Sequence, residues 1–272
     1  MTRQQENHIF NDFILLIKDK LTTKFGKNYD SSDSVVDAKY GDDFIRFIAE
    51  AAEKIDENAS VYCGMTKCVI VFPEVSRVLK IPFSGLYFKD DCSNFHFHNF
   101  INATKDIPHP DSEWDYCETE SYLYEKAKED GFSEFLAEEE LYEWCNDMPI
   151  YTQAKAKVAF VTNGYVGLSE DEIINIKEKI RDSETLTMSP FYGDWLVKAV
   201  SKYGVPRIED FVINFIRKYN IKDLHLGNIG YDINGNPVLI DWSSWNDGSR
   251  TMSISEYYYS GSYKRDRKEY GT

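Results

Sequence analysis

Residues 221–228 read Ile-Lys-Asp-Leu-His-Leu-Gly-Asn, and residues 238–241 read Val-Leu-Ile-Asp. Asp223 and Asn228 are five positions apart in a loop that a glycine makes flexible, and Asp241 ends an apolar strand 13 positions later. An Asn-Gly pair lies between them and predicts a tight hairpin turn. Because a hairpin of this length folds its two ends together, we expect Asn228 to lie beside Asp241.

The three polar side chains suit a site that handles phosphate and magnesium. Asn228 and Asp241 offer one amide oxygen and one carboxylate, which are hard ligands of the kind that Mg²⁺ binds while it keeps water and phosphate at its other positions. Asp223 is then left to orient an attacking hydroxyl or to accept its proton. We therefore predict a catalytic aspartate with a two-residue metal site behind it.

The rest of the chain predicts a mixed α+β protein. Short β-branched runs broken by glycine and proline are typical of an antiparallel meander, and apolar residues at helical spacing predict amphipathic helices. The predicted strands are residues 61–63, 68–72, 78–81 and 149–153. The predicted helices are residues 8–20, 41–55, 114–129 and 207–219, and a further helix is predicted to begin with a cap at residues 169–172. The acidic run 138–140 is interpreted as the solvated face of a helix.

This order of elements predicts three segments. Residues 1–58 form an N-terminal helical extension, residues 59–156 a small sheet lobe with one helix, and residues 157–272 a reduced, mostly helical lobe with a polar tail. A sheet-rich part followed by a helical part is an α+β arrangement.

The net charge and the composition of the chain limit the classes of partner that it can bind. A net charge of −15 over 272 residues argues against general binding to nucleic acid or to a membrane surface, both of which are negative. ATP remains compatible, because Lys and Mg²⁺ can reverse the field locally. Five scattered cysteines and the lack of a signal-like apolar segment predict reduced thiols and a cytoplasmic protein, in the host cytoplasm if a phage encodes it.

The pattern Asp-x-x-x-x-Asn, a hairpin and an Asp that ends an apolar strand resembles the catalytic loop and metal-binding Asp of the protein-kinase-like superfamily. The sequence of residues 223–229 resembles the aminoglycoside phosphotransferase and atypical-kinase branches of this superfamily more closely than ordinary protein kinases. Of the His-Arg-Asp and Asp-Phe-Gly signatures, only the carboxylates of Asp223 and Asp241 are kept. The resemblance covers about residues 59–245 and implies a two-lobed fold, ATP and Mg as cofactors, and phosphate transfer to hydroxyls.

The resemblance also implies residues upstream of the polar loop. Lys80, which follows Val78 and Leu79, resembles the lysine that holds the α- and β-phosphates. A helical carboxylate is expected to pair with it; Glu120 fits the apolar spacing of its helix, and Glu118 is the alternative. The turn Gly64-Met65-Thr66 resembles a single-glycine phosphate loop, and residues 153–156, with Gln153 first, are the candidates for the backbone that binds adenine.

The chain departs from ordinary protein kinases after Asp241. Only 31 residues follow it, without an Ala-Pro-Glu anchor, so the lower lobe is expected to be minimal or to be completed by the N-terminal helices, and the acceptor class stays open. A protein hydroxyl is our first expectation and a small molecule the second. A nucleotide-binding pseudokinase and a nucleotidyl transferase on the same fold are the alternatives. The compact core resembles kinase-like proteins of bacteria and bacteriophages, and the oligomeric state is left open.

Overall fold

The computed structural model describes residues 1–20, 38–63, 67–82, 87–88, 95–96, 116–145, 148–159, 164–191, 193–219, 221 and 224–242. The chain divides into two compact units. Unit 1 contains residues 1–122 and 138–155, and unit 2 contains residues 123–137 and 156–272. Both units combine helices with antiparallel sheet, so the protein is α+β.

Unit 1 is built on a five-stranded sheet in the order β1-β2-β3-β7-β6, in which every neighbouring pair is antiparallel. The expected meander is confirmed, and the strand expected at residues 149–153 lies next to it. The strands are β1 (Ser60–Cys63), β2 (Lys67–Val71), β3 (Arg77–Pro82), β6 (Glu139–Cys145) and β7 (Met148–Ala154). A separate pair is formed by β4 (Tyr87–Phe88) and β5 (Phe95–His96).

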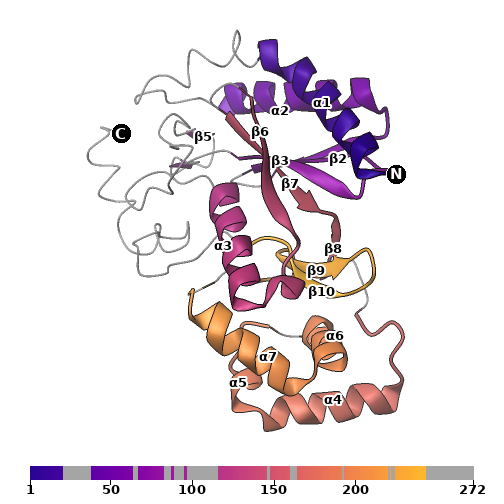
Figure 1. The fold of residues 1–272 in the computed structure, drawn as a ribbon, viewed down its shortest axis with the longest axis vertical. Helices are drawn as coiled ribbons and strands as arrows, with labels where there is room; N and C mark the ends of the chain where they lie inside the picture. Colours follow the sequence, from indigo (N-terminus) through magenta and orange to yellow (C-terminus); the bar gives the residue numbers. More distant parts are fainter. Residues whose placement is uncertain are drawn as a thin grey trace, which may run out of the picture. The chain divides into compact units, whose positions relative to one another are not determined.

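Two helices at the N-terminus cover one face of this sheet (Figure 1). They are α1 (Arg3–Lys20) and α2 (Ala38–Ile55), which confirm the two expected helices and begin earlier than expected. Their apolar side chains share one core with Ile70, Leu79 and Ile81 of the strands. Phe72 contacts the rings of both Phe10 and Phe13, with centroids 6.3 and 6.0 Å apart.

The alternation of strand residues then decides which side chains face away from α1 and α2. Leu79 and Ile81 of β3 point into the core with these helices, so Lys80 between them points to the opposite face. Lys80 lies opposite Tyr151 of β7, and Val69 of β2 lies on its other side. The second face of the sheet is therefore the one on which Lys80 stands.

The acidic run 138–140 differs from its sequence interpretation. We expected a solvated helix face, but these residues enter strand β6, and the side chain of Glu139 is completely buried. Glu138 and Glu140 on either side are about two-fifths exposed and pair with Arg77. The strand period of two, rather than the helical period, explains why the middle residue alone is buried.

Helix α3 (Tyr116–Asp130) confirms the expected helix at residues 114–129. A short 3-10 helix, Ser133–Phe135, follows it and leads toward β6. Glu120, Leu123 and Ala127 of α3 are completely buried, which is the stripe that the helical spacing predicts.

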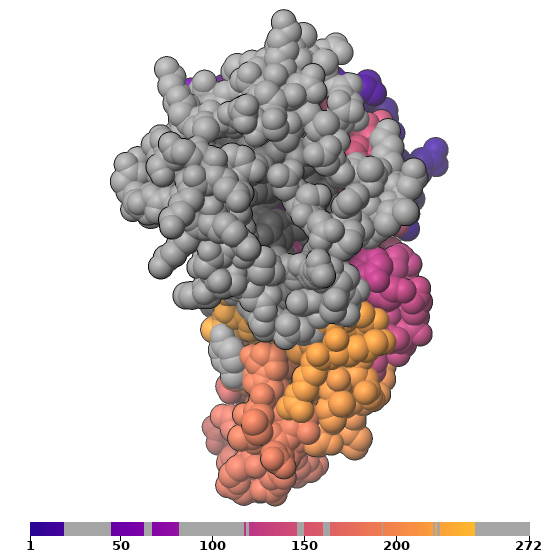
Figure 2. Space-filling model, turned by 90° about the vertical axis from the view of Figure 1, so that its left-hand side faces the viewer, coloured from indigo at the N-terminus to yellow at the C-terminus, as the bar shows by residue number. Residues whose placement is uncertain are grey.

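Unit 2 is mainly helical, and residues of its helices form the salmon-to-orange part of the surface in Figure 2. The helices are α4 (Glu170–Asp182), α5 (Glu184–Thr187), α6 (Gly193–Tyr203) and α7 (Val205–Phe211), the last of which continues as a π-helix over Val212–Arg217. The expected capped start of α4 is confirmed, because Ser169 and Glu172 form a capping box. Helix α6 was not expected from the sequence.

An aromatic cluster forms the core of unit 2. The rings of Phe135 and Phe211 stack with centroids 4.2 Å apart, and those of Phe191 and Trp195 with centroids 4.5 Å apart. The Trp195 indole N–H donates to the carbonyl of Gly230 at 2.9 Å, which ties α6 to the small sheet of this unit. The buried ring edge of tryptophan thus has the polar partner that it needs.

That small sheet has the order β10-β9-β8, with β8 (Ala156–Val158), β9 (Ile229–Asp232) and β10 (Pro237–Leu239). The expected hairpin between β9 and β10 is confirmed, and Gly235 takes a positive φ of 76° in its turn. Asp232 fixes the turn by accepting hydrogen bonds from the backbone N–H groups of Asn234 and Asn236, each at 2.8 Å. The third strand, β8, was not expected.

Gly230 of β9 provides a test of this sheet. A methyl group at this position would overlap the carbonyl oxygen of Lys157 and the side chain of Ile240. We expect Gly230→Ala to lower the free energy of unfolding by about 1–3 kcal/mol, the usual range for overpacking. Gly235→Asn is the control, because no atom lies within 4 Å of its Cβ and asparagine tolerates positive φ. Equal unfolding midpoints in urea for the two variants would contradict this packing.

Two further findings bear on the sequence expectations. Within the described residues, no helix is long and apolar enough to cross a membrane. Cys117 and Cys145 carry buried, reduced thiols. Cys68 is disulfide-bonded, so the expectation of reduced thiols is wrong for this residue.

Candidate functional site

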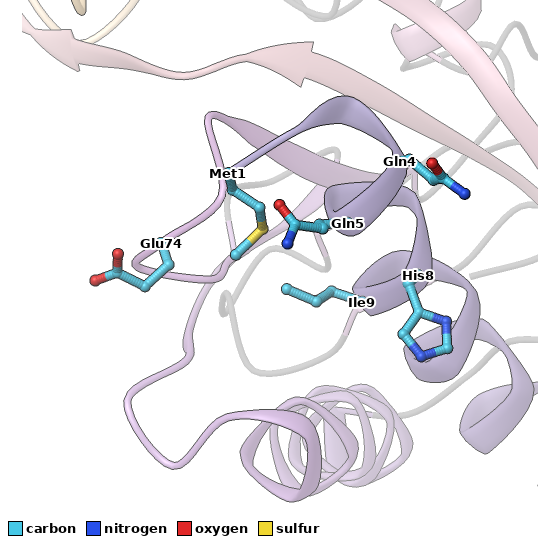
Figure 3. Close-up of a pocket in the computed structure, with 6 residues that line it drawn as sticks. All are labelled: Met1, Gln4, Gln5, His8, Ile9 and Glu74. Carbon is cyan, nitrogen blue, oxygen red and sulfur yellow. The ribbon is translucent and has the colours of Figure 1, made fainter.

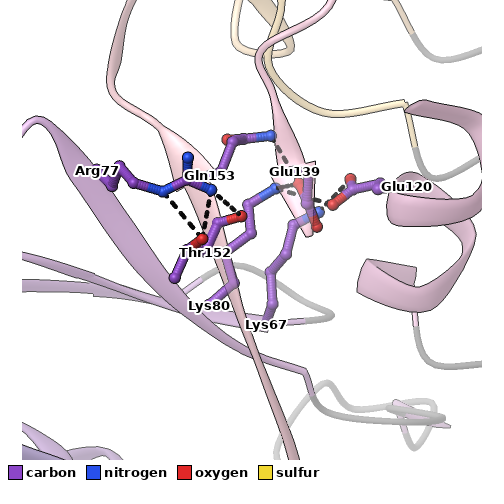
Figure 4. A network of polar contacts seen from close by, with 7 residues as sticks. All are labelled: Lys67, Arg77, Lys80, Glu120, Glu139, Thr152 and Gln153. Atoms are coloured by element: carbon purple, nitrogen blue, oxygen red, sulfur yellow. Dashed lines mark hydrogen bonds and ion pairs between the residues drawn. The ribbon is translucent and has the colours of Figure 1, made fainter. Parts of the chain in front are cut away.

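The predicted phosphate-binding lysine lies in the middle of a buried polar cluster of unit 1 (Figure 4). The Lys80 side chain is only 2% exposed, and its ammonium group donates to Glu120 Oε2 at 2.8 Å. Glu120 is fully buried and comes from α3, 40 residues further along the chain. Strand β3 and helix α3 therefore bring together the lysine and the carboxylate that the sequence paired.

A second carboxylate, which was not predicted from the sequence, contacts the same ammonium group. Glu139 Oε2 accepts from Lys80 Nζ at 2.6 Å and from the Gln153 side-chain amide at 2.7 Å. Glu139 and Gln153 lie directly opposite one another on β6 and β7. Because cross-strand neighbours point to the same face, this pair belongs to the Lys80 face of the sheet.

A second lysine completes the cluster. Lys67 begins strand β2, and its ammonium group contacts Glu120 Oε1 at 2.5 Å. Lys67 and Lys80 therefore bind the two different oxygens of one carboxylate. Lys67 is two residues from Val69, the residue opposite Lys80, which puts both lysines on the same face. The sequence signal that was missed is the two-residue spacing of Lys67 and Val69, which puts both side chains on one face of strand β2.

The electrostatics of Lys80 follow from these neighbours. Burial by itself lowers the pKa of a lysine, since it disfavours the charged form. Glu120 and then Glu139 act in the opposite direction and prevail, so that the pKa of Lys80 lies above its ordinary value of 10.5. Lys80 is thus a charged ammonium group at neutral pH, held in a buried position by two carboxylates.

Arg77 organises the other face of the sheet. It lies three positions before Lys80 on β3, which puts it on the opposite face, and its guanidinium Nε donates to the Thr152 hydroxyl at 3.0 Å. It also pairs with Glu138 and Glu140 at the sheet edge. These contacts are structural, because Arg77 and the Lys80 cluster point away from one another across the sheet.

Three groups of the cluster are of the kind that bind metals. The ligand atoms of Cys117, Glu120 and Glu139 lie within 4.8 Å of one another. However, the ammonium groups of Lys67 and Lys80 already contact both carboxylates at 2.5–2.8 Å. A divalent cation here would meet two positive charges, so the geometry favours ion pairing over metal binding.

The predicted metal ligands lie in unit 2, where the hairpin brings them together. The backbone N–H groups of Ile240 and Asp241 both donate to the carbonyl of Asn228, at 2.8 and 3.1 Å. This places Asn228 beside Asp241, as the hairpin length predicts. Asn228 is buried, and Asp241 is partly exposed directly after β10.

The loop before Asn228 is held by its own histidine. His225 Nδ1 accepts a hydrogen bond from the Gly227 N–H at 2.9 Å, and the Asn228 N–H donates to the His225 carbonyl at 2.9 Å. The ring lies so close to Gly227 that a Cβ there would stand 2.8 Å from His225 Cε1. His225 therefore braces this loop, and a larger residue at position 227 would displace its ring.

Several predicted site residues lie outside the described part of the chain. Asp223 is among them, as are the three residues of the expected phosphate loop, Gly64, Met65 and Thr66. The side chain of Glu118, the alternative partner of Lys80, is also not described.

The expected adenine-binding backbone begins inside the sheet. Gln153 lies in β7 with β3 on one side and β6 on the other, and its side chain bonds to Glu139. The next two N–H groups are used as well, because Ala154 donates to Glu138 and Lys155 to Ser76. Those two amide groups therefore have partners in the protein itself.

A surface hollow elsewhere in unit 1 lacks comparable chemistry. It is lined by the first residues of α1 and by Glu74, as Figure 3 shows. Its lining consists of Met1, Gln4, Gln5, His8, Ile9 and Glu74. Two amides, one imidazole, one carboxylate and two apolar side chains on an open surface give no convergent set of charges, in contrast to the Lys80 cluster.

Comparisons with known proteins add no family to this picture. No protein-family model matches the chain, and no curated protein matches its sequence.

Proposed function

We propose that this protein is an ATP- and Mg²⁺-dependent phosphotransferase with a two-lobed, protein-kinase-like fold. The observation that carries the proposal is the buried ion pair between Lys80 of a sheet strand and Glu120 of a helix. An ammonium group fixed by a helical carboxylate is how kinase-like enzymes present a cation to the α- and β-phosphates. The sheet order β1-β2-β3-β7-β6, with Lys80 on its third strand, is compatible with the small lobe of such a fold.

The donor set at the hairpin fits magnesium. Asn228 and Asp241 provide an amide oxygen and a carboxylate, which Mg²⁺ prefers over nitrogen and sulfur ligands. Their backbones are joined by hydrogen bonds, so the two residues belong to one local structure. When bound, Mg²⁺ supplies positive charge to the phosphate oxygens of ATP.

The chain's own residues would then act as follows. Lys80 binds phosphate oxygens, and Glu120 positions it. Asp223 accepts the proton of the acceptor hydroxyl while the hydroxyl oxygen bonds to the γ-phosphorus and the bond to the β–γ bridging oxygen breaks, which releases ADP. Catalysis of this kind comes mainly from positioning and charge neutralisation.

Radiolabel transfer tests the proposal. We expect label from [γ-³²P]ATP to reach an acceptor or water in the presence of Mg²⁺, and Asp223→Asn to slow this by about 10²- to 10⁴-fold, the usual contribution of a general base. Transfer from [α-³²P]ATP instead would identify a nucleotidyl transferase. Thermal stabilisation by ATP without any transfer to protein, small-molecule or water acceptors would identify a pseudokinase. The exposed Asp182 of α4 gives the control Asp182→Asn, which should leave the rate unchanged.

A further inference from the structure

The cluster around Lys80 is electrically balanced without any ligand. Lys67 and Lys80 contribute two positive charges, and Glu120 and Glu139 contribute two negative charges, all from side chains that are almost completely buried. A phosphate that approaches Lys80 therefore meets no net positive charge from these four groups. One of the carboxylates has to give up its contact with Lys80 before phosphate oxygens can replace it.

The two carboxylates are not held equally well. Glu120 uses both oxygens, Oε1 for Lys67 and Oε2 for Lys80. Glu139 uses Oε2 alone, for both Lys80 and Gln153, whereas its Oε1 is buried and has no hydrogen-bond partner among the described residues. A buried carboxylate oxygen without a donor is costly, so the anchoring of Glu139 is the weaker of the two.

The two carboxylates also differ in the partner that each would retain if Lys80 exchanged its contact with that carboxylate for a contact with phosphate. Glu120 keeps the full charge of Lys67, which compensates it inside the protein. Among the described residues, Glu139 keeps the neutral amide of Gln153 as its partner. A phosphate at Lys80 would therefore be repelled mainly by Glu139, the carboxylate that no second cation of the cluster neutralises.

We propose that Glu139 is an internal counter-ion: its carboxylate contacts Lys80 at the position where a nucleotide phosphate would bind. Glu139 thereby limits the affinity of the protein for polyphosphate, while Glu120 stays bound to Lys67 and Lys80. This inference rests on the proposed function for the identity of the ligand. Glu139 is thereby a residue that sets phosphate affinity, and Lys67 is the residue that keeps Glu120 in place.

The test compares variants of the full chain by titration calorimetry with inorganic tripolyphosphate, which has the phosphates of ATP without the nucleoside. Glu139→Gln keeps the shape of the side chain and removes its charge, and we expect it to tighten tripolyphosphate binding about tenfold. Glu139→Met, of similar volume, is the second variant and should tighten binding as well. Glu120→Gln should weaken binding, because both lysines lose the carboxylate that positions them.

Glu138→Gln is the matched control. It changes the net charge of the protein by the same amount one residue away, but Glu138 is exposed and pairs with Arg77 on the other face. We expect this variant to bind tripolyphosphate as the unchanged protein does. The inference is overturned if Glu139→Gln binds no more tightly than Glu138→Gln, if Glu139→Gln and Glu120→Gln change the affinity alike, or if no variant binds tripolyphosphate at millimolar concentration.

Failure of this inference and failure of the proposed function give different results. A protein that transfers phosphate from ATP, but whose affinity does not rise in Glu139→Gln, refutes the counter-ion alone. If the protein transfers no phosphate, but Glu139→Gln binds tripolyphosphate more tightly than Glu138→Gln, the counter-ion role of Glu139 is supported and the phosphotransferase proposal is refuted.

Discussion

Replacing Asp241 by alanine is expected to reduce phosphate transfer by about 10³-fold at saturating ATP. In the proposed site this residue supplies the only carboxylate to Mg²⁺, beside the neutral amide of Asn228. A metal that neutralises transition-state charge contributes several kcal/mol, and about 1.4 kcal/mol corresponds to a factor of ten in rate. The measurement is the initial rate of transfer from [γ-³²P]ATP over a range of Mg²⁺ concentrations.

Asp241→Ala should also require more Mg²⁺ for half-maximal rate, which a purely structural role of Asp241 would not produce. Its backbone N–H donates to Asn228 and is unaffected by the substitution, so the hairpin should persist. Asp182→Ala, which removes an exposed carboxylate of α4, is the matched control and should leave both quantities unchanged. Full activity of Asp241→Ala at the usual Mg²⁺ concentration would refute the metal assignment.

The largest effect on stability is expected for Glu120→Ala. This substitution leaves the buried ammonium groups of Lys67 and Lys80 without the carboxylate that contacts both of them. Removing one member of a buried ion pair costs about 3–5 kcal/mol, because the remaining charge stays out of water. We expect a loss of this size in the free energy of unfolding, measured in urea by tryptophan fluorescence.

The same helix provides the control. Glu125 of α3 is about half exposed and pairs with Lys128 at the surface. Exposed pairs of this kind contribute little, so Glu125→Ala should change the free energy of unfolding by less than about 0.5–1 kcal/mol. If Glu120→Ala were no more destabilising than Glu125→Ala, the buried cluster would not contribute to the stability of unit 1.

The sequence predicted those features that depend on local patterns. The strands of the meander, the capped start of α4 and the Asn-Gly hairpin each have a signal within a few residues, and all three were found. Helix α6 was missed, although Trp195, Leu196, Val197, Ala199 and Val200 are all buried. These apolar residues lie on one side of the helix, and the polar residues Asp194, Lys198, Ser201 and Lys202 lie on the other, so the one-sided period of a surface helix was present in the sequence and was overlooked.

The candidate site shows what local sequence patterns cannot predict. Lys80 and Glu120 could be paired because a known pattern joins them, and Asn228 and Asp241 because a hairpin does. Glu139 could not be found in this way: its sequence neighbours Glu138 and Glu140 are exposed, and a run of three acidic residues is usually a solvated surface. Only the register of β6 against β7 turns Glu139 toward Lys80, and register is a property of strands that are distant in sequence.

The cover that α1 and α2 place on the sheet has an evolutionary consequence. Strand residues that meet these helices must keep their volume and apolar character, whereas their immediate neighbours on the Lys80 face must keep charge and sign. Most substitutions in these strands therefore change either the apolar core or the polar face around Lys80, but not both. The N-terminal helices thereby separate the two kinds of constraint, so that a change of charge on the Lys80 face leaves the apolar core beneath these helices intact.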